Sequence, residues 1–195
     1  MSRETPGGGE DTHALLIQAG LEELTEYGAA HFSSRRVAKK CGVSSAAPYK
    51  YFKDVNAFIA AILKYVISLY SVRQEKLLET YADCDSRRQL VEIALDYIRF
   101  LTEFPELRRA LMQSSRYSGP EYQNLQGSIS IQIYRVAARY SRDMNISPEA
   151  RRRKTFMIRS IIYGAAAFID QGSMPRGEES MELARAMLER ELDLP

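Results

Sequence analysis

The chain has 195 residues, of which 45% are hydrophobic and 27% charged, and its formal net charge is +2. This composition is typical of an ordinary globular protein and excludes a disordered chain, while the length allows one or two domains with a real core. No basic and apolar leader opens the sequence, and the uncharged apolar run "IIYGAAAFI" is far shorter than the roughly 20 residues that a membrane span needs. We therefore expect a cytoplasmic protein with no membrane partner.

Residues for metal binding or catalysis are scarce. The two cysteines, Cys41 and Cys84, and the two histidines, His13 and His31, show no metal-ligand spacing. Paired carboxylates or an activated nucleophile do not recur at usable spacing, and no glycine-rich phosphate loop follows residue 55. We expect no metal, no cofactor and no catalytic residue.

The small net charge conceals one strongly basic segment. Residues 33–53 contain six lysines and arginines and no acid, so the remainder of the chain carries an excess of acid. A basic segment of this kind neutralises phosphates, which an acidic surface repels. The segment predicts a surface that binds nucleic acid.

Two helices are predicted in the first fifth of the chain. Residues 1–10 have a proline, three consecutive glycines and almost no apolar surface, which predicts a disordered tail. Apolar residues then recur at helical spacing from Asp11 or Thr12 as far as Gly28. A second helix follows from Ser33 or Ser34, and one of its faces carries Arg35, Arg36, Lys39 and Lys40. Like charges four residues apart cost a few tenths of a kcal/mol, so we expect an anion on that face, with a merely solvated basic face as the alternative.

The stretch "GVSSAAPYKYF", residues 42–52, has the pattern of a turn and a second helix in a helix-turn-helix. Gly42 ends the preceding helix, and a cap at Ser45 would place Pro48 at the third helical position, where no intrahelical bond is lost. Phe52 is expected in the core. Small residues let the helix N-terminus approach a DNA phosphate, and hydroxyls and charges follow them: Ser44, Ser45, Ala46, Ala47, Tyr49, Lys50, Tyr51 and Lys53.

Residues 16–63, with "VAKKCGVS" followed by an aromatic pair and Lys53, resemble the DNA-binding domain of the tetracycline-repressor (TetR) family of bacterial transcriptional regulators. The resemblance implies that Ser33, Ser34 and Arg35 approach the operator from the start of the second helix. It also implies a recognition helix that carries Ser45, Ala46, Ala47, Tyr49, Lys50 and Tyr51, with Lys53 on the DNA backbone. The chain departs from the family pattern at Pro48 and Val55, where members often have leucine and lysine.

The rest of the sequence reads as helix after helix, so we expect an all-α protein. A three-helix DNA-binding domain, 11–56, precedes a helical ligand-binding and dimerisation bundle, 57–195. Apolar spacing and proline or glycine interruptions predict the helices of the bundle at 54–81, 90–104, 105–112, 121–143, 147–172 and 178–192.

The last two predicted helices are expected to form a homodimer. The helix at 147–172 is apolar nearly all round, which predicts burial, and Gly164 to Ala167 permit close helix approach, at a dimer seam or in an intramolecular core. The final helix has an apolar stripe at Met181, Ala184, Leu188 and Leu192. The resemblance favours the dimer, because TetR-like proteins dimerise through their last two long helices.

Aromatic residues, methionines and one arginine of the bundle are expected to line a cavity for a small-molecule effector: Tyr97, Phe100, Phe104, Met112, Tyr117, Tyr134, Arg159 and Tyr163. Most of them are equally compatible with an ordinary core. Arg159 lies in an apolar stretch, so it must be exposed, paired with an acid, or available to an anionic ligand. The basic run 151–154 is read as a solvated helix start, because four successive residues spread around a helix.

The sequence predicts a dimeric repressor that binds a palindromic double-stranded DNA operator and is released by a small molecule. The alternatives are a helical adaptor or an all-helical enzyme without sequence-specific DNA binding. The placement of both histidines in the N-terminal fifth argues against the enzyme.

Overall fold

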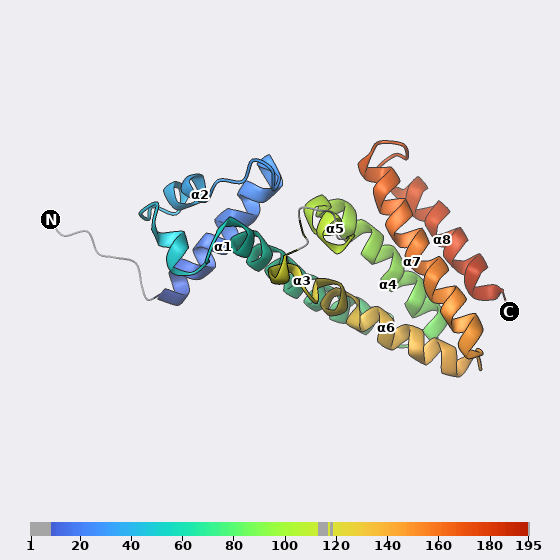
Figure 1. Ribbon diagram of the computed structural model, residues 1–195. Helices are drawn as coiled ribbons and strands as arrows, with labels where there is room; N and C mark the ends of the chain where they lie inside the picture. Colours follow the sequence, from blue (N-terminus) through green and yellow to red (C-terminus); the bar gives the residue numbers. More distant parts are fainter. Residues whose placement is uncertain (1–8, 113–116, 118, 195) are drawn as a thin grey trace.

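The computed structural model describes residues 9–112, 117 and 119–194, and every regular element in these ranges is helical. The all-α prediction is confirmed. In chain order the elements are α1 (Gly9–Tyr27), α2 (Ser34–Lys40), η1 (Ala47–Lys50), α3 (Val55–Thr80), α4 (Ser86–Glu103), α5 (Pro105–Leu111), η3 (Pro120–Tyr122), α6 (Leu125–Asp143), α7 (Pro148–Asp170) and α8 (Glu178–Asp193), where η denotes a 3-10 helix. Figure 1 shows α1 and α2 at one end, α4 to α8 at the other, and α3 between them.

The N-terminal group is built around one aromatic cluster. The ring of Phe52, which is buried as predicted, stacks on Phe58 of α3 with 4.1 Å between centroids, and Phe32 meets Phe58 edge-on at 5.3 Å. Gly42 has φ +68°, a left-handed conformation that glycine adopts without strain, and it turns the chain after α2. These contacts hold α1, α2 and η1 on the first turns of α3.

Helix α3 joins the two ends of the molecule. It is capped by Asp54, whose carboxylate accepts from the Ala57 backbone N–H at 2.8 Å, and its 26 residues span about 39 Å at 1.5 Å per residue. By length and composition alone α3 could cross a membrane. Packing explains its buried apolar residues, because α3 contacts α1, α4 and α6, whereas Tyr65, Leu69 and Val72 are exposed.

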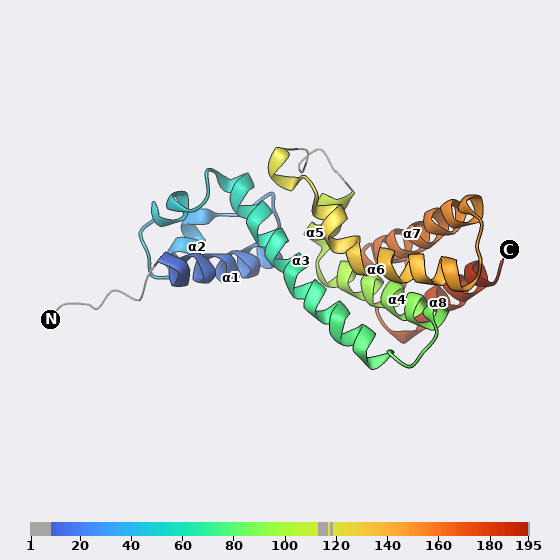
Figure 2. The same cartoon turned by 90° about the horizontal axis from the view of Figure 1, so that it is seen from below.

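Helix α4 is the centre of the C-terminal bundle and is buried along almost its whole length. It packs on α3, α6, α7 and α8, and Figure 2 shows the bundle from a second side. Its buried acids are paired from neighbouring helices: Arg185 of α8 donates to Glu92 at 2.7 Å, and Nε of Arg73 on α3 donates to Asp96 at 2.8 Å. These pairs fix α3 and α8 against α4.

Three predicted helix starts are wrong by a few residues. Helix α4 begins at Ser86, four residues before the predicted start at residue 90. Helix α1 begins at Gly9, two residues before the expected cap, so residues 9–10 of the predicted tail are helical, while 1–8 lie outside the described residues. Helix α6 begins at Leu125 instead of residue 121. Pro120 opens a separate 3-10 turn, and Asn124, at φ +66°, takes a left-handed conformation that interrupts any continuous helix.

The last two helices differ from the prediction in which faces they bury. In α7, Phe156 and Phe168 are exposed, at 71% and 52%, so the helix is not buried all round. In α8, the predicted stripe (Met181, Ala184, Leu188, Leu192) is buried within the chain, because this face packs on α4 and α7. The outer face of α8 instead carries Leu183 and Met187, both about half exposed.

The basic run at the start of α7 is solvated only in part. The side chains of residues 151–153 are exposed, as expected, but Lys154 is buried. Its ammonium donates to the backbone carbonyls of Glu191, at 2.7 Å, and of Leu194. Lys154 therefore satisfies carbonyls at the C-terminal end of α8, a contact that sequence spacing does not reveal.

Candidate nucleic-acid interface

The start of α2 is fixed by two serines. Ser33 is the N-cap, and its hydroxyl accepts from the Arg36 backbone N–H at 3.3 Å. Ser34 is buried, and its hydroxyl is hydrogen-bonded at 3.0 Å to the hydroxyl of Tyr49. Ser34 thus positions Tyr49, which itself remains 54% exposed.

The predicted recognition helix is a short 3-10 helix, and the predicted cap is wrong. Ala46, not Ser45, precedes the first helical residue, and it makes no side-chain capping bond. The backbone N–H groups of Ala47 and Tyr49 donate to carbonyls three residues back, at 2.9 and 3.2 Å. Pro48 is the second residue of the 3-10 helix, where its missing N–H costs no intrahelical bond.

Two of the four cations on α2 are paired within the protein. Arg36 donates from Nε at 2.8 Å to Glu23, a buried carboxylate of α1, and its guanidinium lies 4.3 Å from the Tyr27 ring centroid. The hydrogen bond to Glu23 raises the pKa of Arg36. Lys40 pairs with Glu22 of α1, whose hydrogen bond likewise raises the pKa of the lysine. The expectation that all four cations face an external anion is therefore wrong for Arg36 and Lys40.

The other cations of the segment remain on the surface. Arg35, Lys39, Lys50 and Lys53 are exposed, and none has an ion pair within the described parts of the chain. The small and aromatic residues around them divide into two groups. Ser44, Ser45, Ala46 and Tyr51 are exposed, whereas Ala47 and Pro48 are buried beneath them. The result is a cationic surface on α2 and η1 with small side chains and two tyrosine hydroxyls.

The residues predicted to line an effector cavity do not come together in one place. Tyr97, Phe100 and Tyr117 are buried, Phe104 and Tyr163 are partly buried, and Met112, Tyr134 and Arg159 are exposed. Phe100 stacks on Tyr70 with 3.9 Å between ring centroids, so it is a core residue. Tyr117 is held by its hydroxyl, which donates to Glu106.

Three of those residues, Met112, Arg159 and Tyr163, line an open groove of about 660 Å³ between the end of α5 and the face of α7. We call it the α5–α7 groove. Its other lining residues include Arg152 and Phe156, so it offers two guanidinium groups beside apolar surface. Arg159 is exposed, which was one of its three predicted alternatives, and it has no ion pair among the described residues.

Sequence reasoning missed a polar group in the core of the bundle. The hydroxyl of Tyr70, the amide nitrogen of Gln74 and one carboxylate oxygen of Asp96 are buried with no hydrogen-bond partner among the described residues. Burial raises the pKa of Tyr70 well above its ordinary value, and the Asp96 charge raises it further. The sequence does hold a signal for this buried polar group, because its polar residues fall on helix positions that are ordinarily apolar.

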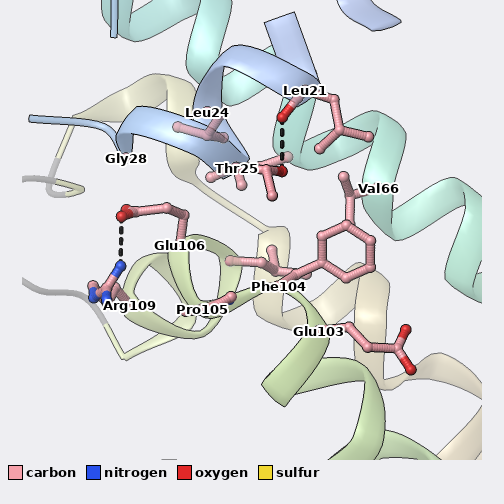
Figure 3. Close-up of a pocket in the computed structure, with 12 residues that line it drawn as sticks. Leu21, Leu24, Thr25, Gly28, Val66, Glu103, Phe104, Pro105, Glu106 and Arg109 are labelled. Atoms are coloured by element: carbon pink, nitrogen blue, oxygen red, sulfur yellow. Dashed lines mark hydrogen bonds and ion pairs between the residues drawn. The ribbon is translucent and has the colours of Figure 1, made fainter. Parts of the chain in front are cut away.

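A second hollow, of about 240 Å³, lies where the two ends of the molecule meet. Figure 3 shows Leu24 and Thr25 of α1 on one side of it and Phe104 and Glu106 on the other. Glu106 is paired with Arg109 at 2.5 Å and reaches toward Gly28. The N-terminal group therefore touches the bundle beside α5 as well as through α3.

Comparisons with known proteins match both the sequence and the fold. A family model described as bacterial regulatory proteins, tetR family, matches residues 16–62. A Mycobacterium bovis protein described as an HTH-type transcriptional regulator is 31% identical over 97 residues, which cover 48% of this chain and 46% of that relative. The chain thus spans about half the length of the curated relatives it matches.

Solved structures extend the likeness over nearly the whole chain. A TetR-family regulator from Marinobacter aquaeolei is 23% identical with a TM-score of 0.63, and the alignment covers 93% of this chain and 95% of that one. The regulator FadR from Bacillus subtilis, solved with stearoyl-CoA, is 17% identical with a TM-score of 0.66 over 93% of this chain and 98% of FadR. At these identities the structures show a shared fold. Residues 16–62, which span most of α1, α2, η1 and the start of α3, thus match the tetR family of bacterial regulatory proteins, and nearly the whole chain shares its fold with a solved TetR-family regulator.

Proposed function

We propose that this protein is a cytoplasmic transcriptional regulator that binds a palindromic DNA operator as a homodimer and is released by a small molecule. The observation that carries the proposal is the exposed, unpaired set Arg35, Lys39, Lys50 and Lys53 on the helix-turn-helix. Residues 11–56 form the DNA-binding domain in this proposal, and 57–195 form the effector domain.

Different residues have different roles on the DNA. Lys50, Lys53 and Arg35 neutralise phosphates, and Tyr49 and Tyr51 present hydroxyls to the groove or the backbone. Ser44, Ser45 and Ala46 allow close approach because their side chains are small. Three further residues support this surface from within the protein. Ser33 caps α2, Ser34 is hydrogen-bonded to Tyr49, and Ala47 is buried.

Replacement of Lys50 tests these roles. We expect Lys50→Ala to weaken operator binding at least tenfold, because this exposed lysine follows Tyr49 on η1 and is one of the four cations proposed to face DNA. Lys76→Ala, which removes an exposed lysine in the second half of α3, is the matched control and is expected to leave binding unchanged. Fluorescence anisotropy with a labelled operator measures both. Equal affinities for Lys50→Ala and the unaltered protein would contradict the assignment of the DNA-binding surface.

The homodimer is proposed to form through the outer faces of α7 and α8. Phe168 on α7 and Leu183 and Met187 on α8 are large apolar side chains left at least half exposed. Exposed apolar residues gathered on two adjacent helices mark an interaction surface. Two copies of this helix pair can bury the residues in a four-helix interface, and twofold symmetry then presents two helix-turn-helix units to a palindrome.

The effector is proposed to be an anionic molecule with an apolar part, bound in the α5–α7 groove. Arg152 and Arg159 supply positive charge there, and Leu111, Met112 and Phe156 supply apolar surface. The FadR neighbour was solved with stearoyl-CoA, a ligand that has both parts. Release of DNA requires that the ligand bind more tightly to a conformer in which the two DNA-binding domains no longer match the operator.

A further inference from the structure

A second basic hollow lies at the end of the bundle that is far from the DNA-binding surface. It has a volume of about 350 Å³ and is lined by the last turns of α3, the start of α4 and one face of α6. Three of its lining residues are arginines of α6: Arg135, Arg139 and Arg142. We propose that this hollow, the α6 arginine site, binds a compact soluble ligand that carries two or more phosphate or carboxylate groups.

The spacing of the arginines directs them to the same place. Positions 135, 139 and 142 are separated by four and three residues, so their side chains share one face of α6. Val136 of the same helix and Leu78 of α3 add apolar surface to the lining. Gln89, which is buried, also lines the hollow, and its amide group is anchored by donation to the Tyr81 carbonyl at 2.8 Å. The Gln89 side chain is therefore held in place on the lining of the hollow that the guanidinium groups share.

The three guanidinium groups have no counter-charge in contact with them in the described part of the chain. Within the described ranges none of them forms an ion pair, and the one polar contact recorded is a weak bond from Arg135 to the Gln132 amide oxygen at 3.5 Å. The nearest acid on the helix, Asp143, is engaged by the Ser86 hydroxyl, which donates to it at 2.5 Å. No acid lines the hollow. Like charges at these spacings repel one another, and an anion between them removes that cost.

The chemistry and the size define the class of ligand. Guanidinium groups bind phosphate and carboxylate with paired, parallel hydrogen bonds, and three of them suit a ligand with more than one negative charge. The volume admits a small molecule. Operator DNA is excluded from this site by position, because α3 separates it from the DNA-binding domain by about 39 Å at 1.5 Å per residue.

Calorimetric titration of the whole protein with inorganic pyrophosphate and with citrate tests the proposal. The variant is Arg139→Gln, which removes the central guanidinium. The control is Arg151→Gln, which removes the same charge from an exposed residue that lines neither basic hollow. We expect Arg139→Gln to weaken binding at least tenfold and Arg151→Gln to change it less than twofold, at both 50 and 150 mM salt. Retained helical circular dichroism shows that the variant is folded.

Three results would overturn the proposal. One is the absence of measurable binding of both probes to the unaltered protein. Another is equal weakening by the two substitutions, which indicates diffuse charge attraction. The third is Arg139-dependent binding to phosphatidic acid vesicles without binding of either soluble probe, which indicates a membrane surface in place of a small ligand. None of these tests involves operator DNA, so the outcome is independent of the proposed regulatory function.

Discussion

Individual side chains decide how much of the basic segment can reach DNA. Arg36 and Lys40 belong to it by sequence, yet Glu23 and Glu22 of α1 neutralise them. The carboxylates lie 13 and 18 residues earlier in the chain, so only the fold reveals the pairing. The contact of Ser34 is likewise visible only in the fold, where the buried Ser34 hydroxyl is hydrogen-bonded to the hydroxyl of Tyr49.

Substitution of two helical glycines by alanine is expected to change the free energy of unfolding in opposite directions. A Cβ at Gly20 in α1 would lie 2.7 Å from Cδ1 of the buried Ile62 and 3.1 Å from the Phe58 ring, so α3 or its side chains must move. We expect Gly20→Ala to lower the free energy of unfolding by roughly 1–3 kcal/mol through overpacking.

The control is Gly127→Ala in α6, where nothing lies within 4 Å of the added Cβ. We expect this change to raise the free energy of unfolding by about 0.5–1 kcal/mol, because alanine loses less backbone entropy in a helix. Urea unfolding followed by circular dichroism measures both variants. Equal effects of the two substitutions would show that the close packing of α1 on α3 is wrong.

At the scale of elements, the sequence predicts most helices and fails at particular residues. Helices α2, α3 and α7 begin within one residue of their predicted starts. Their caps, Ser33, Asp54 and Ser147, are local interactions that fix these starts. The predicted cap fails at η1, where Ala46 takes the position expected for Ser45 and makes no side-chain hydrogen bond. The predicted effector residues are dispersed in the fold, because an apolar stripe has the same spacing whether it faces a groove, as Tyr163 does, or the core, as Phe100 does.

The attachment of α8 to α4 predicts a dependence of stability on pH. Glu92 is buried, which by itself raises its pKa, but hydrogen bonding and charge from Arg185, together with charge from Arg88, hold the pKa below the ordinary value of 4.5. A carboxylate with a lowered pKa in the folded state stabilises the protein above pH 4.5, and this contribution is lost as the pH falls through the lowered pKa.

We expect Glu92→Gln to be less stable than the unaltered protein at pH 7 and to lose less stability on acidification. Glu182→Gln, which removes an exposed carboxylate of α8, is the control and should follow the unaltered protein. Urea unfolding at pH 7 and at pH 4 provides the comparison. If all three proteins lost the same free energy of unfolding between pH 7 and pH 4, the ion pairs of Glu92 would not contribute to the pH dependence of stability.

For the whole molecule, the proposed function depends on two surfaces at separate places. The cationic surface lies on α2 and η1 at one end of α3, and the apolar faces of α7 and α8 lie in the bundle at the other (Figure 1). The fold class was predictable because helix spacing and the basic segment are local features. The distribution of exposed residues on α7 and α8 was not, because it depends on which faces α4 covers.

A charge on the apolar surface tests the dimer. We expect Leu183→Glu to shift the protein from dimer to monomer in analytical ultracentrifugation, because the interface would bury an unpaired carboxylate. Glu182→Gln again serves as a neighbouring control. A Leu183→Glu protein that remains dimeric and binds operator with full affinity would place the interface elsewhere.

The central claim is tested most directly by selection of binding sites from a random pool of duplex DNA, followed by measurement of operator affinity over a range of salt concentrations. We predict enrichment of a palindrome. Four unpaired cations in each protomer give at most eight phosphate contacts for the dimer, so the slope of log affinity against log salt should be negative and no steeper than about −7. A folded dimer that enriches no sequence would contradict the assignment as a DNA-binding regulator, and a slope near −11 would contradict the internal pairing of Arg36 and Lys40.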